Sequence, residues 1–77
     1  MLPLTETIRQ TRQRMGWSQE DMARRIGVSL STVQRWERRG GKPSRLATQA
    51  LARVFRRAGV ENPLDHPLPV YRKDTEA

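Results

Sequence analysis

The sequence predicts an all-α domain of five helices, four clear and one short, followed by a short C-terminal arm. Three observations support this fold class. Apolar residues recur three or four positions apart in four stretches, and glycine follows each stretch. No pair of alternating apolar and polar stretches suggests a β-hairpin. The chain has 77 residues, which suffices for one small domain with a thin core.

The first helix is expected over residues 5–15. Leu4, Ile8 and Met15 recur at helical spacing with polar residues between them, and Gly16 ends the helix. The large side chain that follows, Trp17, is expected to close the corner before the next helix by packing.

The second helix is expected to begin after Ser18, which can act as its N-cap. Asp21 stands at the third helical position, so the pair is close to a capping box. Gly27 ends the helix because glycine enters the left-handed conformation at little cost. The inward face consists of Met22, Ala23 and Ile26, and Val28 plugs the following turn.

The third helix is expected over residues 30–38, capped by Ser29. Val33 and Trp36 stand three positions apart, which places both on its inner face and indicates that Trp36 belongs to the core. The break after this helix consists of Gly40, Gly41 and Pro43.

The fourth helix is expected to run from the cap Ser44 to about Ala58, with Gly59 at its C-cap. Val60 can then contact Phe55 in a Schellman ending. A last short turn is expected over 63–66 after the Asn-Pro pair. The apolar stripe of the fourth helix comprises Leu46, Ala47, Ala50, Leu51, Val54 and Phe55.

Two parts of the chain are expected from this pattern. Residues 1–62 form the helical domain, and residues 63–77 form an arm that holds prolines and shows no periodicity. The net charge is +7, but residues 5–58 hold thirteen Lys or Arg against four Asp or Glu, whereas residues 59–77 hold two against four. A compact basic domain is suited to a polyanion, although such charge also serves solubility.

Several classes of protein are disfavoured. The chain has no cysteine, no apolar run of membrane-spanning length and no basic-then-apolar leader, so we expect a cytoplasmic protein without membrane association. One histidine, His66, and scattered serines provide neither a metal site nor a nucleophile–base set. We therefore expect no enzyme activity, no metal and no cofactor.

The strongest functional signal is the segment 19–38, QEDMARRIGVSLSTVQRWER. It predicts two short helices joined by a tight turn, the second polar and ending in arginines, which is the layout of a helix-turn-helix that enters a DNA major groove. Counted from Gln19, a small residue is needed at position five, glycine at nine and a β-branched residue at fifteen. Ala23, Gly27 and Val33 meet these demands.

The strings GWSQEDMARRIGVS, STVQRWERR and LATQALARVF resemble the Cro/phage-repressor (XRE-like) helix-turn-helix family, over residues 4 to about 58. The resemblance implies a lambda-repressor-like domain and a transcriptional repressor that binds palindromic operators in double-stranded DNA as a homodimer. It also implies a bacterial or phage-encoded regulator, often of its own operon, or an antitoxin with a toxin partner.

The resemblance also implies site residues. Leu30, Ser31, Gln34 and Arg35 fall where family members touch base edges, with Arg35 suited to a guanine and Leu30 to apolar contact only. Arg12 and Glu37 match a pair of residues that, in the family, often joins the first helix to the third. Arg12 could also reach a phosphate. The expected phosphate contacts are Gln19, Arg12, Thr32, Arg38, Arg39, Lys42, Ser44 and Arg45.

Two other functions remain open. The chain could be a protein-interaction module, an antitoxin or phage accessory factor, whose arm captures a partner through Val70 and Tyr71, or the same arm could wrap a second copy. Deleting residues 67–77 separates these cases by loss of dimer mass or of a co-purifying protein. RNA binding by the basic face is disfavoured because an aromatic sheet platform and a GxxG clamp are lacking.

Overall fold

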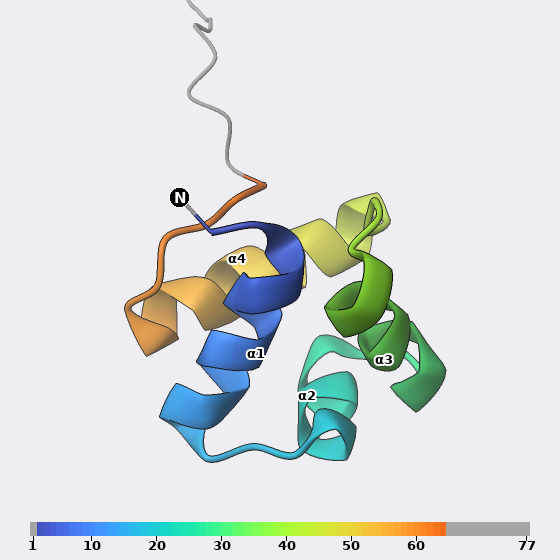
Figure 1. Ribbon diagram of the computed structural model, residues 1–77, viewed down its shortest axis with the longest axis horizontal. Coiled ribbons are helices and arrows are strands. Elements are labelled where there is room, and N and C mark those ends of the chain that lie inside the picture. Colours follow the sequence, from blue (N-terminus) through green and yellow to red (C-terminus); the bar gives the residue numbers. More distant parts are fainter. Residues whose placement is uncertain (1, 65–77) are drawn as a thin grey trace, which may run out of the picture.

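The structure is a computed structural model that describes residues 2–64. Within this range the chain forms four α-helices and no strand (Figure 1), which confirms the all-α fold class. Each helix begins and ends within one residue of its predicted position. The helices are α1 (Leu4–Met15), α2 (Gln19–Ile26), α3 (Leu30–Arg39) and α4 (Arg45–Ala58).

The core lies where α1 and α2 meet α3 and α4. Helix α1 packs against α3 and α4, and α2 packs against the same two helices. The largest side chains with almost no exposure are Trp36, Phe55 and Ile8, so the prediction that Trp36 belongs to the core is confirmed. The partly buried side chains that pack against this core are Trp17, Val28, Ala50, Val60 and Leu64.

The turn between α2 and α3 depends on Gly27. Its φ is +88°, in the left-handed region, and its N–H donates to the Ala23 carbonyl at 2.8 Å. The next N–H, from Val28, donates to the same carbonyl at 3.0 Å. Two hydrogen bonds on one carbonyl turn the chain sharply and set the direction in which α3 leaves.

Substituting Gly27→Ala is expected to lower the free energy of unfolding by about 1–2 kcal/mol. An added Cβ would have open space around it, so the cost comes from the positive φ and not from a clash. Chemical denaturation measures it. Ala52→Gly, inside a helix with ordinary backbone angles, tests the reverse preference and should cost about 0.5–1 kcal/mol. If Gly27→Ala leaves stability unchanged, the turn does not hold the left-handed backbone.

Two side chains predicted to face inward do not. Leu46 was expected in the apolar stripe of α4, but it is 77% exposed. The buried stripe of α4 contains Ala47, Leu51 and Val54. Leu46 is rotated about 100° from Ala47 around the helix axis, in the direction opposite to Leu51, so it lies outside this stripe. The main packing of α4 is against α1 and α2, and the exposure of Leu46 shows that no helix covers its side of α4. Met15, the last residue of α1, is only partly buried.

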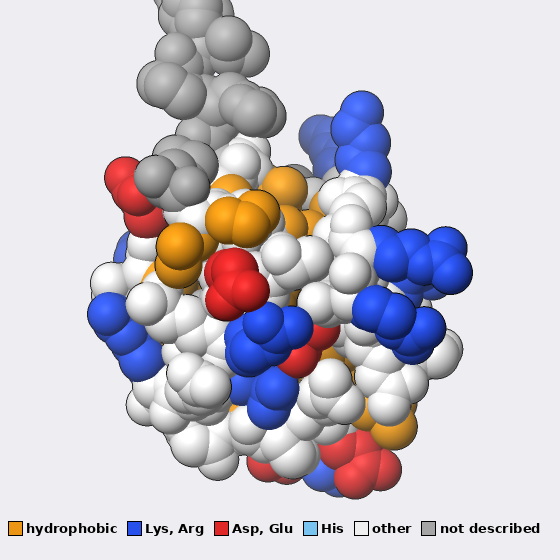
Figure 2. Space-filling view, viewed as in Figure 1, with side chains coloured by type: hydrophobic (Ala, Val, Ile, Leu, Met, Phe, Trp, Pro, Cys, Tyr) orange, Lys and Arg blue, Asp and Glu red, His pale blue; other side chains and the backbone are white. Residues whose placement is uncertain are grey.

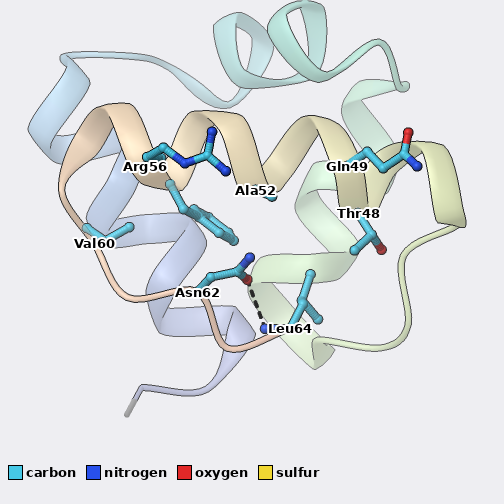
Figure 3. A pocket seen from close by; sticks show the side chains of 8 residues that line it. Thr48, Gln49, Ala52, Arg56, Val60, Asn62 and Leu64 are labelled. Carbon is cyan, nitrogen blue, oxygen red and sulfur yellow. Dashed lines mark hydrogen bonds between the residues drawn. The ribbon is translucent and has the colours of Figure 1, made fainter. Parts of the chain in front are cut away.

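The segment after α4 returns along the helix. The Val60 N–H donates to the Phe55 carbonyl at 3.0 Å, which is the expected Schellman bond. The fifth, short helix is not present in the described residues: 63–64 form a turn, and 65–66 lie outside the described range. Between this segment and α4 lies a groove of about 440 Å³, whose lining includes Phe55 of α4 and Leu64 of the returning segment. Figure 3 shows Val60, Asn62 and Leu64 on the side of the returning segment.

Candidate nucleic-acid interface

The N-terminus of α2 is held by a complete capping box. The Ser18 hydroxyl accepts from the Asp21 N–H, and the Asp21 carboxylate accepts from the Ser18 N–H, both at 3.0 Å. The hydrogen bonds from the Ser18 N–H and then its hydroxyl lower the pKa of Asp21. The cap determines where Gln19, the first residue of α2, emerges next to α1 and α3.

A buried carboxylate connects three helices at this place. Glu37 of α3 is 6% exposed, and its two oxygens accept from Arg12 Nε at 2.5 Å and Arg12 Nη2 at 3.0 Å. Gln19 Nε2 donates to the same carboxylate at 3.3 Å, and Arg9 Nη2 donates to the Glu37 carbonyl at 3.1 Å. The expected pairing of Arg12 with Glu37 is therefore present, and it holds α1, α2 and α3 in one arrangement.

The ionised form of Glu37 is favoured in spite of burial. Desolvation by itself raises the pKa of the Glu37 carboxyl, but the hydrogen bonds from Arg12 and Gln19 and the charges of Arg12 and Arg9 outweigh it, and the pKa lies below its ordinary value of 4.5. The hydrogen bond to Glu37 in turn raises the pKa of Arg12. A charged network of this kind is stable only while both signs are present.

Beside this network lies a polar hollow of about 330 Å³. It is lined by residues from α1, the start of α2 and the outer side of α3. Gln19, Gln34 and Arg38, which the sequence assigned to DNA, meet here although they come from two helices. The complete lining is Arg9, Gln19, Gln34, Glu37 and Arg38.

The outer side of α3 carries the residues predicted to touch bases. Val33 and Trp36 face the core, whereas Leu30, Ser31 and Arg35 are exposed and Gln34 is partly buried at the hollow. The Ser29 hydroxyl caps the helix by accepting from the Thr32 N–H at 3.2 Å, and it also bonds to the Thr32 hydroxyl at 2.9 Å. The residues predicted to touch bases thus lie on the side of α3 that faces away from the core, with Gln34 partly buried, and α3 stands at the edge of the molecule (Figure 1).

A basic loop follows directly. Gly40 and Gly41 have φ of +79° and +101°, and they reverse the chain before α4 begins at the cap Ser44. The Ser44 hydroxyl accepts from the Ala47 N–H at 3.2 Å. Figure 2 shows Lys and Arg side chains gathered along the edge that α3 and this loop form. The exposed cations here are Arg35, Arg38, Arg39, Lys42 and Arg45.

None of these five cations has an acidic partner among residues 2–64. The ion pairs of the described range involve only Arg9, Arg12 and Arg24 as cations. The predicted phosphate residues therefore divide into two groups. Lys42 and the loop arginines are exposed and unpaired, whereas the guanidinium of Arg12 is occupied by Glu37 and the Trp17 carbonyl.

Arg9 lines the candidate interface, although the sequence reasoning did not include it among the candidate site residues. It lines the polar hollow with Gln19 and Gln34, and its guanidinium also bonds to Glu6 at 3.0 Å. Its spacing held a usable signal, since a residue three positions before Arg12 shares the same helix face.

Comparison with known proteins agrees with this geometry. A family model described as helix-turn-helix matches residues 8–61, which is most of the chain. No curated protein and no solved structure gives a significant match. Within the part of the chain that the structure describes, no helix is long and apolar enough to cross a membrane. The chain therefore belongs to the helix-turn-helix family of the Cro/phage-repressor (XRE) type and is a DNA-binding transcription regulator.

Proposed function

We propose that the protein is a repressor that binds an inverted-repeat operator as a homodimer and, by occluding a promoter, controls its own operon, as a phage regulator or an antitoxin does. The observation that carries the proposal is the exposed stripe of α3, which ends in a basic loop without acidic partners. Two copies of α3 would enter successive major grooves about 34 Å apart.

The roles follow from placement. Arg35 would donate to guanine O6 and N7, and Gln34 would reach adenine or the neighbouring backbone. Ser31 and Leu30 would complete the base contacts, Leu30 by apolar contact with a thymine methyl. Gln19 would present the first turn of α2 to a phosphate. The other proposed phosphate contacts are Thr32, Arg38, Arg39, Lys42, Ser44, Arg45 and, at the edge of the Glu37 network, Arg12.

Fluorescence anisotropy tests the proposal. The duplex is the DNA upstream of the protein's own gene, compared with a scrambled duplex over a salt series. We expect binding to the upstream DNA to be tighter by about a thousandfold or more at physiological salt. Equal and steeply salt-dependent binding to both duplexes would contradict sequence-specific operator binding and show a basic domain that binds DNA without sequence preference.

Substituting Lys42→Ala is expected to weaken binding to every duplex and to reduce the salt slope by about one. Lys42 is exposed in the loop, where a phosphate is the only proposed ligand. The measurement is the slope of log affinity against log salt. Arg53→Ala removes an equal charge from an exposed position on α4, outside the groove and outside the proposed DNA contacts, and serves as the matched control. An unchanged slope for Lys42→Ala removes this residue from the phosphate contacts.

The groove beside α4 favours a role for the arm. Leu64 lines this groove, and the residues that follow it include the apolar side chains of Leu68, Val70 and Tyr71. We propose that the arm of a second copy fills the groove and builds the dimer. The double substitution Val70→Ser and Tyr71→Ser in the full chain should then convert dimer mass to monomer mass in light scattering. A retained dimer would favour the second function, capture of a partner protein by the arm.

A further inference from the structure

We propose a second binding surface at the junction of α2 and α4, which takes an acidic protein segment that carries an apolar side chain. The surface is a hollow of about 210 Å³ on a side of α4 different from that of the groove in Figure 3. Neither the proposed DNA contacts nor the proposed dimer contacts include it. Its lining consists of Trp17, Arg25, Ala50, Arg53, Val54 and Arg57.

Three arginines from two helices converge on this hollow. Arg53 and Arg57 stand four residues apart on α4 and so share a face, and Arg25 comes from the end of α2. All three are exposed, and none has an ion pair among residues 2–64. Arginines near the C-termini of helices interact favourably with the helix dipoles. This interaction explains an arginine on each helix, but it does not explain why arginines of α2 and α4 line the same hollow. Like charges this close repel each other, so a bound anion would relieve the repulsion.

The rest of the hollow is apolar. Trp17 and Ala50 are partly buried and pack against the core, and Val54 is 9% exposed. The Arg25 guanidinium lies over the Trp17 ring, 5.1 Å from its centroid, and this cation–π contact holds Arg25 at the rim. An apolar floor with a guanidinium rim matches a side chain such as leucine flanked by carboxylates.

The position of the hollow separates it from the proposed DNA face. Arg53 and Arg57 lie eight and twelve residues after Arg45, which begins α4 beside the basic loop. At 1.5 Å per residue they stand roughly 12 and 18 Å further along the helix axis. A segment bound here would leave the loop and the outer side of α3 accessible. The lining favours a protein segment over a nucleic acid, because a phosphate backbone has no apolar side chain that could pack on the apolar floor of the hollow.

The peptide titration uses the full chain without DNA, so peptide affinity is measured independently of operator binding. The probe is a labelled peptide with blocked ends in which one leucine is flanked on each side by three glutamates. The control peptides carry glutamine in place of glutamate, or serine in place of leucine. We expect the first peptide to bind more tightly than both controls and to change the emission of Trp17, since Trp36 is 2% exposed and shielded from the peptide.

Exposed arginines inside and outside the hollow provide matched variants. Arg57→Gln should weaken peptide binding by about threefold to fivefold, and the double variant Arg53→Gln with Arg57→Gln by about tenfold or more. Arg14→Gln removes the same charge from an exposed position outside both the hollow and the groove of Figure 3, and it should change affinity less than about twofold. Helical circular dichroism and melting temperature confirm that each variant is folded.

Four results would overturn the proposal. One is an equal effect of Arg14→Gln and Arg57→Gln, and another is equal binding of the leucine and serine peptides. A third is a loss of duplex affinity in the double variant as large as its loss of peptide affinity, which would assign the arginines to phosphate. The fourth is tighter peptide binding after Asp74→Asn and Glu76→Gln, which would make the chain's own acidic end the occupant.

Discussion

Replacing Glu37 by alanine is expected to lower the free energy of unfolding by about 2–4 kcal/mol at neutral pH. The Glu37 carboxylate is almost fully buried and accepts two hydrogen bonds from Arg12 and one from Gln19. Its removal leaves the guanidinium of Arg12, whose side chain is 19% exposed, without its charged partner. A domain of this size has only a few kcal/mol of net stability, so the variant should be partly unfolded at 37 °C.

Denaturant titration measures this effect, and the chain contains a matched control. Glu6 also pairs with an arginine, Arg9, at 3.0 Å, but the two side chains are 53% and 41% exposed. Solvent screens such a pair, so Glu6→Ala should change stability by less than about 1 kcal/mol. Similar losses in Glu6→Ala and Glu37→Ala would show that burial does not strengthen the Glu37 network.

The same network predicts a pH dependence. Because the pKa of Glu37 in the folded protein lies below its ordinary value of 4.5, its stabilising contribution is complete above about pH 5 and is lost as the pH falls through the folded-state pKa. The difference in stability between the wild type and Glu37→Gln should therefore be constant near neutral pH and shrink below pH 4.5. A difference that grows in acid would contradict a lowered pKa.

Replacing Arg35 by alanine is expected to cost about 1–3 kcal/mol of operator affinity and to relax the preference at one base pair. Arg35 is exposed at the middle of α3, directly after Gln34, and no carboxylate among the described residues competes for its guanidinium. The side chain is therefore free to make a bidentate contact with guanine. Anisotropy with a set of operators, each altered at one position, measures both the loss and its location.

Arg39→Ala is the matched control for this prediction. Arg39 ends the same helix and is also exposed, but it is assigned to a phosphate. Its loss should weaken operator and random DNA alike and leave the base preference intact. If Arg35→Ala also weakens both duplexes equally, its role is electrostatic and another residue of α3 reads the sequence.

Much of the fold was predictable because it depends on short segments. Ser18, Ser29 and Ser44 cap α2, α3 and α4 as expected, since a hydroxyl before a helix satisfies its free N–H groups. Gly27 marks the tight turn because few other residues tolerate its φ of +88°. The outward side of α3 was predictable too. When Val33 and Trp36 are buried on one side of the helix, the side that faces away from the core holds Leu30, Ser31, Gln34 and Arg35. Their contacts with DNA stay predictions.

The sequence by itself thus determined the helix bounds, the turn and the helix-turn-helix family, because caps, glycines and apolar periodicity act within a few residues of each other. Only the tertiary structure decided which faces are covered and which distant side chains meet. Leu46 is exposed although it belongs to an apolar run, since no helix covers its side of α4. Arg9 and Gln34 line one hollow, and Arg25 and Arg53 line another. The packing of the helices decides this, because it sets the distances between residues that are far apart in the sequence.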